Sequence, residues 1–426
     1  MTHIKHLRYY MVGLLFFASV ISYVDRQTLS VNAPYIRADL GLSNTQYGYL
    51  VNAFLVAYAI GPILTGRLVD RIGARLGLSL FIAWWSIAGM MHAATRGLGS
   101  LALFRFLLGL GESGTVPSAM RSISEWFPAQ ERSFAVGLFA GGTAIGALIA
   151  PPLVAFLTLS FGWRVCFLVT GAFGFVWLIA WRLLYARPED HPRLETEERE
   201  LIYAGRLETA GEEKTSIIDL LKHRKPWGII VARFTVNPVW WFYLFWLPSY
   251  LSDERGFSLK AIGLFAWIPF LAADFGCFLG GWLSSRLLRR TGNLSYSRKI
   301  VLFFAAVGML VGMPAASVEE VWVCMALISV VTFSFGVWTT TEVTLCADIL
   351  PPGAVGRMTG LSGTGSALGG ILFTMLTGWL VDHFSYSPVF YLAGALPLLG
   401  FTLLHYIMGV IEPVKLVELG DAELQP

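Results

Sequence analysis

Charged side chains are scarce in this sequence of 426 residues. Only 14% of the residues are Asp, Glu, Lys or Arg, whereas soluble domains carry about 25%. The 31 basic and 28 acidic residues leave a net charge of only +3, which gives no indication of a nucleic-acid partner. Because 55% of the residues are hydrophobic, the composition excludes two or three soluble domains and also intrinsic disorder. We infer a protein that crosses a lipid bilayer many times.

Cysteine is rare as well. The four cysteines lie in apolar runs without paired or metal-ligand spacing, which excludes a disulfide scaffold: Cys166, Cys277, Cys324 and Cys346. The sequence also lacks a His/Cys metal set, a nucleophile elbow and a Walker phosphate loop. We therefore expect no enzyme activity, no metal, no cofactor and no transport driven by ATP.

Long apolar runs dominate what is present. A bilayer core of about 30 Å requires roughly 20 apolar residues in a helix, and the runs are too long and too irregular for membrane strands. The first run ends in Asp25-Arg26 rather than in a cleavage site, so it predicts a retained helix and not a signal peptide. We predict an all-α membrane protein with twelve transmembrane helices, near residues 9–30, 47–69, 77–95, 99–119, 132–157, 162–185, 227–251, 260–285, 298–318, 321–348, 355–381 and 387–411.

The basic residues predict how the chain is oriented. With twelve spans, 23 Lys and Arg residues fall on the side shared by both termini and 5 on the other side, while three lie inside spans. Basic residues concentrate in cytoplasmic loops of membrane proteins. We therefore expect both termini to be cytoplasmic.

A charged segment divides the chain into two halves. Residues 186–226 hold 18 charged residues in 41, which indicates a cytoplasmic linker. We predict a six-helix half at 1–186, a linker at 187–226 and a second six-helix half at 227–426.

The two halves resemble each other. Residues 127–149 align without gaps on residues 350–372, and both segments place a glycine-rich helix after a proline turn. The alternative is that glycine-rich membrane helices are alike because small residues permit close packing. The shared turn and its place in the fifth span of each half favour a pseudo-repeat. Repeats of this kind are typical of alternating-access carriers, whose site lies between the halves.

Four ionisable residues fall inside two of the predicted spans. Asp25 and Arg26 end the first apolar run, and Arg105 and Glu112 lie two turns apart on one face of the fourth helix. Buried charges are costly and indicate a functional site, although a static network is the alternative. Asp25 and Arg26 point about 100° apart, which leaves one arginine free to bind an anionic carboxylate. An acid that exchanges its arginine for a proton would couple proton and anion movement.

Other polar residues within spans are candidates too. Tyr58 is either a packing residue or a substrate ligand, and we expect the intramembrane acid Asp274 to pair with a basic group such as Arg233. Glu342 is a further intramembrane acid, and both Asp274 and Glu342 take part either in coupling or only in structure.

The seventh predicted helix is rich in aromatic residues between two prolines. They form either an interfacial belt or a wall against which a sugar stacks. The second interpretation makes Asn237, Trp240 and Trp241 candidate substrate ligands.

The loop after the second helix reads GRLVDRIGAR at residues 66–75. It resembles the loop signature of the major facilitator superfamily, and this resemblance implies the twelve-helix fold of that family. An acid at a helix end can hold the N-terminus of a helix in the other half, which makes a candidate gate of Gly66, Asp70, Arg71 and Arg75. The alternative is a positive-inside loop with a helix cap. In the second half, Ser285 stands where the aspartate would lie.

Several segments resemble the anion:cation symporter branch of this superfamily, and bacterial hexuronate transporters in particular. The segments that resemble the branch are YVDR (23–26), RFLLGLGES (105–113), SEWFPAQERS (124–133) and APP (150–152). Those that resemble the hexuronate transporters in particular are RF (233–234) with NPVWWFYLFWLP (237–248), AADFG (272–276) and SRK (297–299). The resemblance implies proton coupling by Asp25 and Glu112, and a substrate site with Tyr23, Arg26, Tyr58 and Arg105. One departure is Gly363, which aligns near an asparagine that touches substrate in the galactonate carriers.

We therefore expect a proton-coupled symporter that imports a hexuronate, galacturonate or glucuronate, across the bacterial inner membrane. Its partners would be a sugar-acid anion, a proton and the lipid bilayer, with the protein a monomer. The alternatives are a symporter of another organic anion (galactonate, glucarate, a dicarboxylate or an aromatic acid) and a sugar-acid sensor that does not transport.

Overall fold

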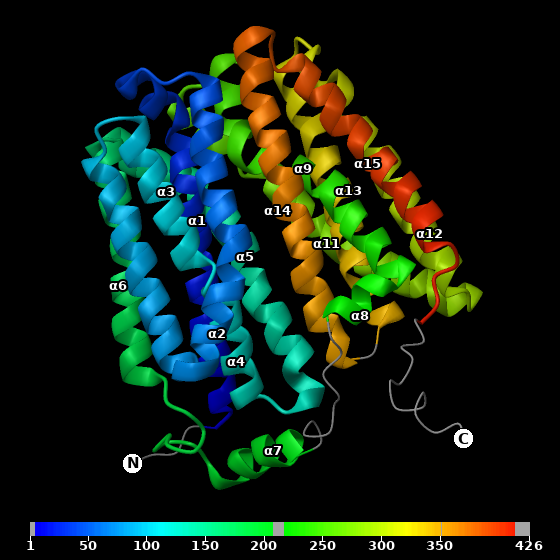
Figure 1. Ribbon diagram of the computed structural model, residues 1–426. Coiled ribbons are helices and arrows are strands. Elements are labelled where there is room, and N and C mark those ends of the chain that lie inside the picture. Colours follow the sequence, from blue (N-terminus) through cyan, green and yellow to red (C-terminus); the bar gives the residue numbers. More distant parts are fainter. Residues whose placement is uncertain (1–4, 208–216, 351, 414–426) are drawn as a thin grey trace.

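The computed structural model describes residues 5–207, 217–350 and 352–413, and this part of the chain is helical without strands (Figure 1). The helices are α1 (Leu7–Leu40), α2 (Asn44–Met91), α3 (Leu98–Glu112), α4 (Thr115–Trp126), α5 (Ala129–Phe161), α6 (Trp163–Leu184), α7 (Thr196–Leu207), α8 (Ile217–Lys222), α9 (Arg224–Asp253), α10 (Leu259–Phe265), α11 (Ile268–Thr291), α12 (Leu294–Leu310), α13 (Val321–Ile349), α14 (Pro352–His383) and α15 (Ser387–Met408), with short 3-10 turns at His92–Ala94 and Met313–Ala316.

The predicted all-α membrane fold is confirmed. Ten helical segments of the described residues are long and apolar enough to cross a membrane. The other two predicted spans, 47–69 and 99–119, lie in the first arm of α2 and in α3 with α4. α2 bends at Gly73, whose φ of 82° is readily adopted only by glycine. The exact count of twelve stays a prediction.

Two bundles stand side by side, α1–α6 on the left of Figure 1 and α9–α15 on the right. The helices α5 and α14 begin 223 residues apart, which is the offset of the sequence alignment. Each packs on the first helix of its half through small residues. A Cβ atom on Gly142 of α5 would lie 2.4 Å from the Phe16 carbonyl oxygen of α1, and one on Gly369 of α14 would lie 2.0 Å from the Phe234 carbonyl oxygen of α9.

These contacts predict that Gly369→Ala destabilises the protein. The added methyl group meets backbone rather than a movable side chain, and overpacking of this kind costs about 1–3 kcal/mol. The matched control is Gly360→Ala on the same helix, where a Cβ atom has nothing within 4 Å. We expect Gly369→Ala to lower the thermal unfolding temperature in detergent and Gly360→Ala to leave it unchanged. Equal unfolding temperatures for the two variants would contradict the close packing of α14 on α9.

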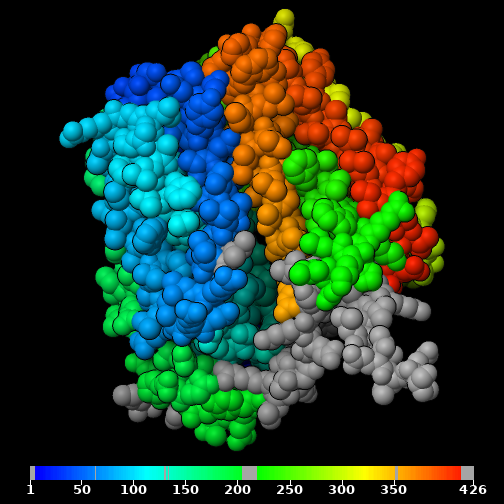
Figure 2. Space-filling model, viewed as in Figure 1, coloured from blue at the N-terminus to red at the C-terminus, as the bar shows by residue number. Residues whose placement is uncertain are grey.

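We call the end of the bundle where α1 begins and α15 ends the inner end, and the opposite one the outer end (Figure 1). At the outer end the halves are in contact: the Ser30 hydroxyl donates to the Leu244 carbonyl at 2.8 Å, and the Tyr47 hydroxyl donates to the Phe245 carbonyl at 2.7 Å. At the inner end they are parted by a pocket of about 890 Å³, lined by Asp70 of α2 and Gly356 of α14 among others. Figure 2 shows the hollow between α2 and α14 at that end. The structure is therefore open toward the inner end.

Candidate substrate and proton site

The site is built around the middle of α1, which packs against α5 and α6 of its own half and α9 of the other. This position buries residues 22–33 of α1 on all sides, so Tyr23, Asp25 and Arg26 are each at most 8% exposed. Neighbouring helices must therefore supply partners for their polar atoms, since no lipid headgroup or bulk water reaches them.

Arg26 and Glu112 form a buried ion pair between α1 and α3. The Nη2 and Nε atoms of Arg26 donate to Oε2 of Glu112 at 2.7 and 3.2 Å, and the Glu112 side chain is fully buried. Three aromatic rings surround the guanidinium, whose Cζ atom lies 4.8–5.1 Å from the ring centres of Tyr23, Phe54 and Tyr58. Ring faces attract a cation, so this cage holds Arg26 in position independently of Glu112.

Asp25 lies on a different face of α1, as the 100° step along a helix requires. It is 2% exposed, and its neighbours include Glu112, Arg105 and Thr170 of α6. Neither carboxylate oxygen has a hydrogen-bond partner of ordinary geometry in the described structure. Asp25 therefore does not share Arg26 with Glu112, and its charge is not neutralised by a direct ion pair.

Arg105 is a buried guanidinium without an anion. It is 1% exposed, and none of its three nitrogen atoms has a hydrogen-bond partner among the described residues. Its electrostatic neighbours are Tyr47, Glu112, Asp25 and Arg26. A buried guanidinium whose donors are all unused is costly, and a planar carboxylate is the group that best fits this fork of donors.

The second half contributes aromatic and amide groups to the same region. The Trp240 indole donates to the Tyr23 hydroxyl at 3.3 Å and so links α9 to α1. The Asn237 amide and the Trp241 indole both donate to the Ser366 hydroxyl of α14, at 2.8 and 3.3 Å. Trp240 also stacks on Phe335 with ring centres 5.4 Å apart. Two of the three predicted ligands in this helix are thus held by one serine.

The expected pairing of Asp274 with Arg233 is wrong. Nε of Arg233 on α9 lies 2.8 Å from Oε1 of Glu342 on α13, and both side chains are buried. Asp274 lies on α11, is half-buried, and interacts electrostatically with Tyr23. The partner of Arg233 is thus decided by the packing of α9 against α13.

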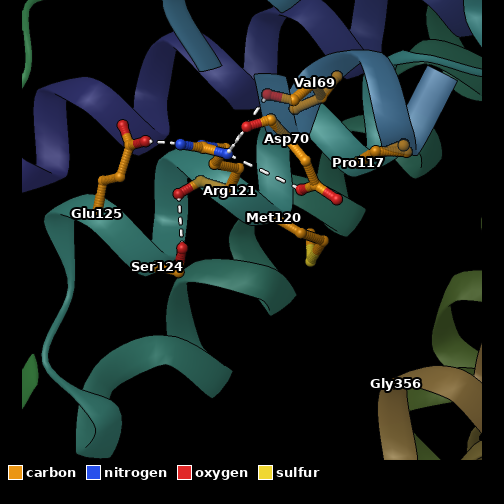
Figure 3. A pocket seen from close by; sticks show the side chains of 9 residues that line it. Val69, Asp70, Pro117, Met120, Arg121, Ser124, Glu125 and Gly356 are labelled. Atoms are coloured by element: carbon orange, nitrogen blue, oxygen red, sulfur yellow. Dashed lines mark hydrogen bonds and ion pairs between the residues drawn. The ribbon is translucent and has the colours of Figure 1, made fainter. Parts of the chain in front are cut away.

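The four predicted gate residues lie at the inner end. Asp70 is 81% exposed and lies 3.8 Å from Arg121 of its own half (Figure 3). Arg71 is exposed, Nη2 of Arg75 donates to the Arg182 carbonyl at 2.9 Å, and nothing lies within 4 Å of a Cβ atom on Gly66. Among the described residues, no hydrogen bond or ion pair joins Asp70 to the other half, whose Gly356 lies across the pocket.

Sequence reasoning missed three residues that shape the site: Phe54, Tyr47 and Ser366. Phe54 is an apolar residue in an apolar run, so only its place over Arg26 marks it. Tyr47 is an electrostatic neighbour of Arg105 and packs edge-on against Trp246, with ring centres 5.0 Å apart. Ser366 lies three residues beyond Gly363 in a run of small residues, which packing alone would explain.

Two bundles of membrane helices that touch at one end, are parted at the other and hold buried charges in their interior are typical of secondary transporters. The model of the Major Facilitator Superfamily matches residues 15–297 and 291–423. The chain belongs to this superfamily, which consists of transporters and not of enzymes.

Curated relatives show the same class. The chain is 35% identical over 404 residues to the hexuronate transporter of Escherichia coli (strain K12), with 94% of each chain covered. It is 36% identical over 314 residues to the galacturonate transporter of Dickeya chrysanthemi, which covers 73% of this chain and 91% of that protein. It is 33% identical over 396 residues to the probable sulfoacetate transporter of Cupriavidus necator, with 91% of each chain covered.

Among solved structures, the crystal structure of a D-xylose-proton symporter matches with a TM-score of 0.75 over 95% of this chain and 98% of the other. The sequence identity of 17% makes this a likeness of fold alone. The match to the superfamily model confirms the resemblance predicted from the loop at residues 66–75.

Proposed function

We propose that the protein imports a hexuronate (galacturonate or glucuronate) together with a proton, and that it does so by alternating access. The observation that carries this proposal is the pair of buried arginines, Arg26 held by Glu112 and Arg105 without an anion. A sugar acid brings one carboxylate and several hydroxyl groups. Hexuronate and galacturonate transporters, at 35% and 36% identity, support that substrate class.

Proton binding and anion binding are linked through Glu112. When Glu112 takes up a proton, its attraction for Arg26 weakens, and the guanidinium can donate two hydrogen bonds to the substrate carboxylate instead. The cage of Tyr23, Phe54 and Tyr58 keeps Arg26 in place during this exchange. When the proton leaves, Glu112 reclaims Arg26 and the substrate is released. Asp25 is the second proton-coupling acid, because it is buried without a cation of its own.

The sugar would lie between the halves. Trp240 and Trp241 offer ring faces for the sugar carbons, and Asn237 offers an amide for hydroxyl groups. Residues 1–186 and 227–426 move as two halves joined by the linker 187–226, and the gate of Gly66, Asp70, Arg71 and Arg75 closes the inner end. The protein works as a monomer in the bacterial inner membrane with both termini in the cytoplasm, an orientation that the basic residues support.

A second candidate is the symport of a different organic anion. The relative named as a probable sulfoacetate transporter, at 33% identity, supports this alternative. A sulfonate or a dicarboxylate would use the arginines but has less use for Asn237, since it offers fewer hydroxyl groups.

Uptake into proteoliposomes tests both candidates. We expect radiolabelled galacturonate to accumulate when the outside is acidic and not when the proton gradient is collapsed by an ionophore. Competition by unlabelled glucuronate, galactonate, glucarate and sulfoacetate then ranks the substrates. Uptake that ignores the proton gradient would overturn the coupling, and stronger competition by sulfoacetate than by glucuronate would overturn the hexuronate assignment.

A further inference from the structure

Asp382, near the end of α14, holds the beginning of α2. Its two carboxylate oxygens accept hydrogen bonds from the backbone N–H groups of Asn44 and Thr45, at 3.0 and 2.7 Å. The first N–H groups of a helix have no partner within the helix, and the N-terminus carries partial positive charge. The acid and the helix end belong to different halves of the protein, so this contact joins the halves at the outer end.

The helices around this contact approach one another closely. A Cβ atom on Gly378, one turn before Asp382, would lie 2.7 Å from the Asn44 carbonyl oxygen. On α2, a Cβ atom on Gly48 would lie 3.2 Å from the Thr374 carbonyl oxygen. The glycines let the two backbones touch, and that proximity brings Asp382 within hydrogen-bond reach of α2.

The inner end offers the reverse arrangement on the same two helices. Asp70 lies near the end of the first arm of α2, and α14 begins at Pro352 across the pocket that Asp70 and Gly356 line (Figure 3). Asp382 thus holds the N-terminus of α2, and Asp70 lies across the pocket from the first turns of α14. The position of α5 that is equivalent to Asp382, at the repeat offset of 223, is Leu159, which is not an acid.

We propose that Asp382 is the outer latch of the transport cycle and the reciprocal of Asp70. A latch here is a contact between halves that holds one end closed. The arm of α2 from Asn44 to Asp70 is a helix about 40 Å long. If this arm tilts as a rigid body, one of its ends closes on α14 while its other end moves away from α14. The hydrogen bonds from Asn44 and Thr45 to Asp382 stabilise the orientation that is open at the inner end. Asp70 stabilises the orientation that is open at the outer end. This inference rests on the alternating access of the proposed function but not on its substrate.

Distances between spin labels test the latch without any substrate. The full chain, with its four cysteines replaced by alanine, receives labels at Ser124→Cys of α4 and Arg290→Cys of α11, one in each half near the inner end. We expect Asp382→Asn to shift the ratio of long to short distances about tenfold toward short, which corresponds to about 1.4 kcal/mol. Asp70→Asn should shift the ratio the other way, and the double variant should return it near the parent value.

Two controls separate a latch from a simple helix cap. Asp382→Glu keeps the charge and should stay within about threefold of the parent ratio. Asp39→Asn removes an acid at the same end whose partner, Arg164 at 2.8 Å, lies in the same half, and should leave the ratio unchanged. An unchanged ratio in Asp382→Asn, with or without a lower unfolding temperature, would overturn the proposal. So would an equal shift in Asp39→Asn. The proposed substrate stands or falls separately, in the uptake assay.

Discussion

Replacing Glu112 by glutamine abolishes gradient-driven accumulation of the sugar acid but leaves exchange of substrate across the membrane. The amide has the shape of a protonated carboxyl group and never reclaims Arg26 from the substrate. A pH difference of one unit is worth about 1.4 kcal/mol for each proton carried, which is a tenfold concentration ratio. For one proton carried with each sugar acid and a pH difference of one unit, we expect this ratio in proteoliposomes that contain the parent protein, and a ratio of one in the Glu112→Gln variant.

Asp25→Asn should also remove accumulation, but for a different reason. Asp25 has no arginine partner, so its loss leaves the bonds between Arg26 and Glu112 intact. We therefore expect the affinity for galacturonate to change little in Asp25→Asn, whereas Glu112→Gln should make the affinity insensitive to pH. Glu254→Gln, at an exposed acid after α9, serves as the control. A tenfold ratio retained by both site variants would show that the protons travel elsewhere.

Replacing Arg105 by lysine weakens substrate binding by roughly ten- to a hundredfold. Hydrogen bonds to charged groups contribute about 1.5–3 kcal/mol each, and an ammonium group cannot offer the two parallel donors of a guanidinium. The positive charge remains, so its field on Asp25 and Glu112 persists. A loss of affinity would therefore reflect the loss of the guanidinium's two parallel donors rather than a change in charge.

Equilibrium binding of radiolabelled galacturonate to the purified protein measures this effect. The control is Arg164→Lys, which changes an arginine at the surface of the outer end. Thermal unfolding of both variants separates weaker binding from a poorly folded protein. Equal affinity in the parent and in Arg105→Lys would remove Arg105 from the substrate site.

Much of the fold could be predicted from the sequence because a membrane restricts the possibilities. Only helices of about 20 apolar residues satisfy their backbone polar groups in lipid without a closed barrel, so apolar runs mark most of the spans directly. The alignment of 127–149 with 350–372 predicted the repeat, and α5 and α14 begin where that offset places them. The bend of α2 at Gly73 was not predicted, since a glycine within a loop signature does not reveal its φ angle.

The partners of buried charges were harder to predict. The sequence places Asp274 and Glu342 in apolar runs alike, but the packing of α9 against α13 decides that Glu342 holds Arg233. From the sequence, Asp382 is only a polar residue at the end of an apolar run. Its hydrogen-bond partners, the N–H groups of Asn44 and Thr45, are more than 300 positions away in the sequence. Contacts between distant segments of this kind depend on how the halves meet, which no local pattern records.

The placement of Asp382 and Asp70 on the same helix pair has a consequence for the direction of transport. Asp382 holds the N-terminus of α2 in this structure, and in our proposal Asp70 holds the N-terminus of α14 in the opposite orientation, so each orientation has one contact of this type. Such contacts change how often each orientation is occupied, but they do not change the free energy of moving a solute across the membrane. The proton and sugar-acid gradients together would decide whether the carrier fills or empties the cell, and a cell with much internal sugar acid and a weak proton gradient would lose that solute through the same protein.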